Sequence, residues 1–176
     1  MPLLKNNTFV SDAWTTIGDE EPFGDGARVI VSLARLQRDW DQLAKHTGLL
    51  GVALPNTAKV SDVEPFFSKV VLIALSFPAF TDGRSYSLAR QLRLDGYRGE
   101  LRATGNILPD QLQYMLQVGI ESFEVSDRFP QDVWQKAAQQ MHLTYQLGLT
   151  RTGDAREIWA QRHQGFAAWE EQPHAG

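Results

Sequence analysis

Eight polar side chains between positions 82 and 111 are of types that bind anions or assist acid–base steps. They are Asp82, Arg84, Tyr86, Arg90, Arg102, Asn106, Asp110 and Gln111. A guanidinium group binds a carboxylate, phosphate or sulfur oxyanion through paired hydrogen bonds, in a way that lysine does not reproduce. The sequence therefore predicts an anion site here, in which Asp82 orients an arginine and Tyr86 and Gln111 supply neutral hydrogen bonds.

Arginine is concentrated in the same segment, where no lysine lies among the five arginines. They are Arg84, Arg90, Arg93, Arg98 and Arg102. The alternative to an anion site is a structural role, because such networks often serve only to hold a domain together. In that interpretation Arg93 and Arg98 are solvated surface residues, and Arg90 pairs with Asp82 or Glu100. The sequence leaves both interpretations open.

Arg102 stands out because it occupies a strand-like segment. In an extended chain Glu100, Arg102 and Thr104 share one face, and Leu101 and Ala103 take the other. A sheet covered on both sides has little room for charges unless they pair or reach its edge. We therefore expect Glu100 to pair with an arginine, and Arg102, near the end of the strand, to reach a ligand.

Strand-like and helix-like segments alternate from residue 28 onward and must position these side chains. The expected strands are 28–32, 49–54, 69–75, 100–103 and 122–125, and the expected helices are 33–46, 85–94, 109–118 and 130–141, with a short helix starting at Ser61. This order predicts an α/β fold of parallel strands joined by right-handed crossovers. We predict a single domain with a mostly parallel sheet of about five strands and helices on both faces. The same pattern also fits half of a barrel.

The two flanks of the predicted core differ from it. We predict an N-terminal arm over residues 1–27, either a hairpin or an arm laid over the sheet, an α/β core domain over 28–146, and a C-terminal helix and tail over 147–176. In parallel sheets, ligands bind at the carboxyl ends of the strands. The polar segments that follow the third, fourth and fifth strands would meet at that edge.

Composition excludes several classes of function. The chain has 176 residues, a net charge of −4 and no cysteine, which argues against a surface that coats nucleic acid and removes thiolate, disulfide and Cys-ligated metal chemistry. The four histidines are scattered without metal-ligand spacing, so we predict no metal and no cofactor. No apolar run has the length of a membrane span. We therefore expect a cytoplasmic protein without membrane or nucleic-acid partners.

A dense pattern of residues between positions 77 and 124 carries a family resemblance. Its members are Phe77, Pro78, Phe80, Asp82, Gly83, Arg84, Tyr86, Ser87, Ala89, Arg90, Leu92, Arg93, Gly96, Tyr97, Gly99, Glu100, Leu101, Arg102, Ala103, Gly105, Leu108, Asp110, Gln111, Gly119, Phe123 and Glu124. This pattern resembles the DUF934 family of bacterial proteins of unknown function. The family usually has glycine where Ser85 stands and an acidic residue where Asn106 stands.

The resemblance implies a role in sulfur metabolism. Such proteins are typically encoded beside a sulfite reductase that contains sirohaem and an iron–sulfur cluster, and some are labelled as oxidoreductases of sulfite reduction. The family brings no established catalytic residues. We therefore expect an accessory protein of assimilatory sulfite reduction that binds an oxyanion or an anionic surface, with the reductase or its electron donor as partner.

Two other functions stay open at this stage. One is a small α/β enzyme that acts on an anionic metabolite, with Asp82 or Asp110 as general base. The other is a structural interaction module that uses the tryptophan-bearing ends of the chain. The sequence does not decide whether the protein is an enzyme.

Overall fold

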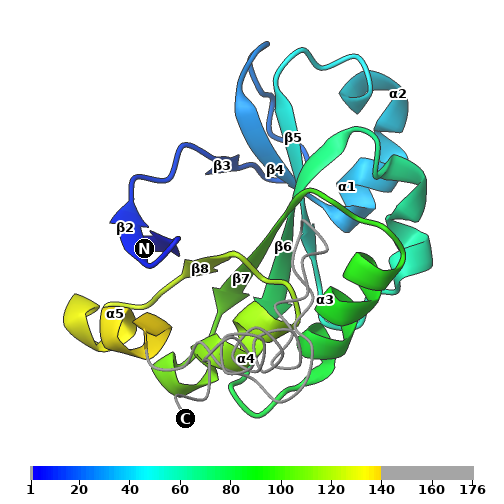
Figure 1. Ribbon diagram of the computed structural model, residues 1–176. Helices are drawn as coiled ribbons and strands as arrows, with labels where there is room; N and C mark the ends of the chain where they lie inside the picture. The colour runs from blue at the N-terminus through cyan, green and yellow to red at the C-terminus, as the bar shows by residue number, and fades with distance from the viewer. Residues whose placement is uncertain (1, 140–176) are drawn as a thin grey trace, which may run out of the picture.

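Eight strands form one curved, mixed sheet in the computed structural model, which describes residues 2–139 (Figure 1). The strand order is β2-β1-β8-β7-β6-β5-β4-β3. The bounds are β1 Leu3–Lys5, β2 Thr8–Val10, β3 Thr15–Thr16, β4 Arg28–Ser32, β5 Leu49–Leu54, β6 Val70–Phe77, β7 Glu100–Gly105 and β8 Ser122–Glu124. Strands β3 to β8 run parallel, and β1 is antiparallel to both β8 and β2.

Five helices and three 3-10 turns accompany these strands in the described part of the chain, and α5 follows the last strand. Their bounds are α1 Leu33–Arg38, α2 Trp40–Leu43, η1 Val60–Asp62, η2 Glu64–Phe66, α3 Arg84–Leu94, η3 Pro109–Gln111, α4 Leu112–Gln117 and α5 Gln131–Gln139. The predicted helix 33–46 is divided at Asp39, whose backbone leaves the helical region at φ −105° and ψ 22°. The chain then turns so that Trp40 packs against Phe66, with ring centroids 4.6 Å apart.

The predicted α/β fold is confirmed, but the sheet has eight strands in mixed directions rather than about five parallel ones. The five predicted strands are present, and the three missed ones lie within residues 1–27. Each has only two or three residues, too few to show an alternating pattern. Asn6 and Asn7 make the tight turn between β1 and β2 at φ 50° and 62°, a backbone conformation that asparagine tolerates well.

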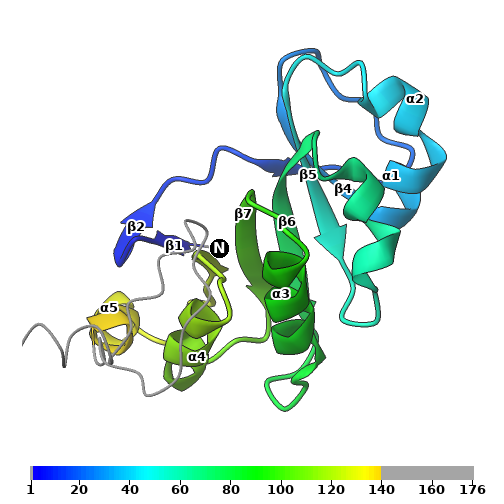
Figure 2. The same cartoon turned by 45° about the vertical axis from the view of Figure 1, so that its right-hand side comes forward.

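The helices cover one face of the sheet, so the prediction of helices on both faces is wrong for the described part of the chain. Their buried apolar side chains all belong to one core cluster, which includes Leu36, Leu92 and Trp134. We call the side that they cover the outer face. The opposite, inner face carries a small separate cluster of Ile30, Leu72 and Ala74. The alternative arrangement, half of a barrel, is the one observed (Figures 1 and 2).

A short connection explains why the sheet curls. Residues 11–14, which we call the strap, join β2 to β3, and these are the two edge strands of the sheet. In a flat sheet the edges of eight strands would lie about 33 Å apart. The chain from Val10 to Thr15 spans at most about 18 Å. The edges must therefore approach each other, and the strap crosses the open side of the sheet (Figure 2).

Several expectations concern residues that the structure does not describe. The C-terminal helix and tail over 147–176 lie outside the described residues, as do the last positions of the predicted helix 130–141. Between residues 2 and 139, none of the helices has the length and apolar character needed to cross a bilayer.

Arg93 is buried, so the expectation that it is a solvated surface residue is wrong. Its guanidinium donates to the carbonyl oxygens of Gly119, at 2.8 and 3.1 Å, of Tyr97 at 3.0 Å and of Gly99 at 2.8 Å. It also lies 3.4 Å from a carboxylate oxygen of Glu121. One side chain of α3 thus satisfies backbone acceptors in the turns that precede β7 and β8.

Replacing Arg93 by methionine should therefore destabilise the protein strongly. Arg93→Met leaves several buried carbonyl groups without donors, and we expect the free energy of unfolding to fall by about 3 kcal/mol. Urea denaturation measures this change. Arg90→Met, on the exposed side of the same helix, is the control and should change it by less than about 0.5 kcal/mol. Equal effects of the two substitutions would contradict the structural role of Arg93.

Candidate functional site

Asp82 and Arg84 form an ion pair at the carboxyl ends of β5 and β6. The Arg84 guanidinium donates to both carboxylate oxygens of Asp82, at 2.6 to 3.2 Å, and the Arg84 backbone N–H donates at 3.1 Å. Asn56, which follows β5, donates its amide to Asp82 at 2.6 Å. The Arg84 side chain remains 59% exposed, whereas that of Asp82 is 17% exposed. Asp82 thus holds the Arg84 side chain in place, and the Arg84 guanidinium faces solvent.

This pairing decides what Asp82 can do chemically. Hydrogen bonds from the Arg84 side chain and backbone, with a smaller contribution from Asn56, lower the pKa of Asp82 to about 2. A general base works best when its pKa lies near the operating pH. Asp82 is therefore a poor proton acceptor and a good holder of a cation.

Tyr86 lies under this edge, on the first turns of α3. Its ring packs against Phe77 and Tyr114, with centroids 5.1 and 4.9 Å apart. Burial, together with the negative charge of Asp110, raises the pKa of Tyr86 to about 12. The tyrosine thus stays protonated at neutral pH and can only donate or accept a neutral hydrogen bond.

Gln111 and Asn106 occupy the loop that follows β7. The Gln111 side chain donates to the Phe80 carbonyl at 2.7 Å and accepts from the Leu108 backbone N–H at 3.1 Å. It therefore ties this loop to the segment that carries Asp82. Asn106 is exposed, and its backbone N–H donates to the Phe77 carbonyl at 2.7 Å.

Arg84 and Arg90 are both exposed on α3 but leave the helix in different directions. Six residues of α-helix correspond to a rise of about 9 Å and a rotation of about 240°, so the two side chains leave the helix about 120° apart. They present two separate positive points on one surface.

Arg102 does not lie at this edge. It points to the inner face and is buried there, with 3% of its side chain exposed. Its guanidinium donates to Asp12 of the strap at 2.8 Å and to Glu100 at 3.3 Å. The register places it beside Ala74 of β6, within the inner face. The structure thus shows the carboxylate pairing of Glu100 with an arginine and separates Arg102 from the other candidates.

Glu100 collects three donors at the middle of this inner-face network. Ser122 donates to it at 2.6 Å, and the Lys5 ammonium lies 2.5 Å from its other oxygen. Burial alone would raise the pKa of Glu100, but the hydrogen bonds from Lys5 and Ser122 and the charges of Lys5 and Arg102 outweigh it, so the pKa is lowered. With Asp12 included, the network has two positive and two negative groups and is electrically balanced.

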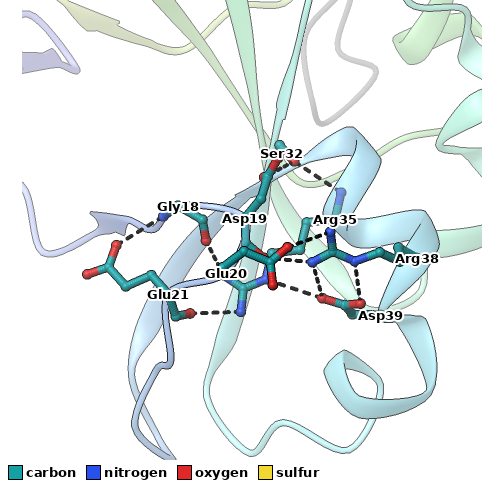
Figure 3. A network of polar contacts seen from close by, with 8 residues as sticks. All are labelled: Gly18, Asp19, Glu20, Glu21, Ser32, Arg35, Arg38 and Asp39. Atoms are coloured by element: carbon teal, nitrogen blue, oxygen red, sulfur yellow. Dashed lines mark hydrogen bonds and ion pairs between the residues drawn. The ribbon is translucent and has the colours of Figure 1, made fainter.

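A second arginine network, which the sequence did not predict, lies between α1 and the segment after β3 (Figure 3). Arg35 and Arg38 of α1 face the acidic segment 18–21, where Arg35 donates to the carbonyls of Gly18 and Glu21. Arg38 donates to the Asp19 carbonyl at 2.7 Å and to the Glu20 carboxylate at 3.0 Å. The signal available in the sequence was the acidic run 19–21 opposite two arginines three residues apart on a helix. The network fixes the segment after β3 to α1.

Comparison with known protein families gives a match over the central part of the chain. The model of the family described as "Bacterial protein of unknown function (DUF934)" matches residues 51–155, more than half of the chain. The matched segment includes Asp82, Arg84 and Arg102 and begins after the strap. No curated protein matches the sequence.

Acid should remove the contribution of the Asp82–Arg84 pair to stability. The folded-state pKa of Asp82, about 2, lies below the usual value of about 3.9 in unfolded chains, so the contribution is present above pH 4 and is lost as the pH falls toward 2. We expect the difference in Tm between the wild type and Asp82→Asn to shrink over that interval. Thermal melts from pH 6 to pH 2 measure it, with Asp127→Asn, an exposed loop position, as control. A difference that stays constant over the whole range would contradict the assignment.

Proposed function

The chain belongs to the DUF934 family, and from that premise we propose that it is an accessory protein of assimilatory sulfite reduction. In this proposal it docks on an anionic surface of the sulfite reductase or of that enzyme's electron donor. The contact is made by Arg84 and Arg90 on the exposed side of α3. The link to sulfite reduction rests on what the family resemblance implies.

The separation of the two arginines carries the docking part of the proposal. Two exposed cations about 9 Å apart along a helix, pointing in different directions, match charges distributed over a protein surface better than one oxyanion. Asp82 fixes Arg84 while leaving it 59% exposed. Among the described residues, one terminal nitrogen of Arg84 makes no hydrogen bond and is available to a partner's carboxylate.

Catalysis by Asp82 is less well supported. A carboxylate whose pKa is about 2 and that already accepts from Arg84 and Asn56 has little capacity to take a substrate proton. Asp110 is exposed in η3, and Tyr86, whose pKa its charge helps to raise, has a pKa of about 12. These observations support a binding role over the alternative of a small enzyme.

A gene deletion tests the assignment to sulfite reduction. We expect the deletion strain to grow poorly on sulfate or sulfite as sole sulfur source and to be rescued by sulfide. A defect at the reduction step has this pattern because sulfide is the product that is missing. Normal growth on sulfate would contradict the assignment, and rescue by sulfite would place the defect at an earlier step.

Direct binding measurements test the docking surface. Because two charge-assisted contacts are lost, Arg84→Gln with Arg90→Gln should weaken binding to the purified reductase or donor at least tenfold, and salt should weaken the wild-type complex similarly. The matched control is Arg128→Gln, an exposed arginine between β8 and α5, which should bind normally. Retained binding by the double variant would contradict the proposal. Calorimetric binding of free sulfite that needs both arginines would instead show an oxyanion site.

A further inference from the structure

A hollow lies at the end of the sheet opposite to the Asp82–Arg84 pair, where β4 to β7 begin. Its volume is about 730 Å³, which falls within the range of small-molecule sites. The side chains that the argument uses are Lys5, Trp14, Arg28, Leu49, Val71 and Arg98, all of which line it. None of the predicted site residues lines this hollow, so it is separate from the docking surface on α3.

Two uncompensated cations flank this hollow. Arg28 is the first residue of β4, and Arg98 precedes β7. Both side chains are exposed. Neither makes an ion pair with another residue in the described part of the chain. Three strand spacings separate β4 from β7, about 14 Å along the sheet. The third cation of the hollow, Lys5, is neutralised by Glu100. The hollow therefore has an excess of two positive charges in a chain whose net charge is −4.

Apolar side chains lie exposed between these cations. Leu49 is 41% and Val71 is 38% exposed, and both are among the few large apolar side chains of residues 2–139 that face solvent. Val71 is exposed because the pairing of β5 with β6 is irregular: Leu50 pairs with Val70 and Gly51 with Leu72, which leaves Val71 over as a bulge. Bulges of this kind re-aim a side chain and are frequent beside functional sites.

Trp14 forms a fixed apolar wall of the hollow. A Cβ atom on Gly51 would lie 3.2 Å from the Trp14 ring, so the absence of a side chain at Gly51 lets the ring lie against β5. The Trp14 backbone N–H donates to Asp12 at 3.1 Å, and the other oxygen of Asp12 accepts from Arg102. The buried Arg102 is thus a positioning residue for this wall.

We propose that this hollow binds a small organic anion that carries acidic groups on an apolar, flat body. Arg28 and Arg98 bind its carboxylate, phosphate or sulfonate groups, and Trp14, Leu49 and Val71 contact its body. The combination of two free guanidinium groups with an exposed apolar floor fits such a molecule better than an inorganic ion, which would leave the floor in water.

A fluorescent aromatic sulfonate tests the proposal with the full-length protein. We expect 1-anilinonaphthalene-8-sulfonate to bind at one site, and Arg28→Gln with Arg98→Gln to weaken its affinity at least tenfold. The matched control is Arg84→Gln with Arg90→Gln, which removes the same charge from α3 and should leave the affinity unchanged within twofold. Because all four arginines are exposed, the variants should stay folded, and a thermal melt of each variant checks this.

A second variant tests the apolar floor. Leu49→Thr should weaken binding of the sulfonate several-fold. The affinity for inorganic sulfate, measured by displacement of that probe, should stay unchanged. Equal loss of affinity in the α3 control, or no loss in the Arg28 and Arg98 variant, would overturn the proposal. So would a dimer in analytical ultracentrifugation that the Arg28 and Arg98 variant dissociates, because a second copy would then occupy the hollow.

Discussion

The four-residue strap imposes the geometric constraint on which the rest of the structure depends. It joins the two edge strands of an eight-stranded sheet, and so short a chain cannot span a flat sheet. The strands must therefore curl, the helices stay on the convex side, and the strap itself closes over the inner face. Asp12 accepts a hydrogen bond from Arg102 and thereby holds the strap at a defined position on the inner face.

A buried cation makes that contact necessary. Removing Arg102 from water is costly unless carboxylates surround it, and Glu100 and Asp12 supply them from the same strand and from the strap. Lys5 and Ser122 then complete the bonding of Glu100. The inner face thus combines this charge network with a small apolar cluster, whereas the outer face is held by apolar packing against the helices. This division leaves α3 free to present arginines outward and leaves a hollow at the beginning of the strands.

Much of the fold could be predicted because its central strands are strongly patterned. The segments 28–32 and 49–54 were predicted with the observed bounds, since each is an apolar run closed by polar residues or by proline. The alternation at β7 also placed Glu100 and Arg102 on one face. The cover of that face was misjudged, since helices were predicted on both faces. The continuous apolar run of β6 indicates cover on both sides without saying whether helices or an arm provide it.

The candidate site could be predicted only where its contacts are local in sequence. Asp82 and Arg84 are two residues apart, so their association follows from one loop. Asp12 and Arg102 are 90 residues apart in the sequence, and no local pattern in the chain predicts their contact. The hollow was missed for the same reason, since Arg28 and Arg98 come together only through strand order and curvature.

Hydrogen exchange of the strap in Arg102→Met tests most directly whether the buried arginine holds the strap on the inner face. We predict that the backbone N–H of Trp14 and those of β1 and β3 exchange at least tenfold faster than in the wild type, because opening of these segments becomes easier. The backbone N–H groups of β6 should keep their protection. Arg84→Met, which removes an exposed arginine, should leave all of these rates unchanged. Unchanged exchange of the strap and its neighbouring strands in Arg102→Met, with the protein folded, would contradict the account.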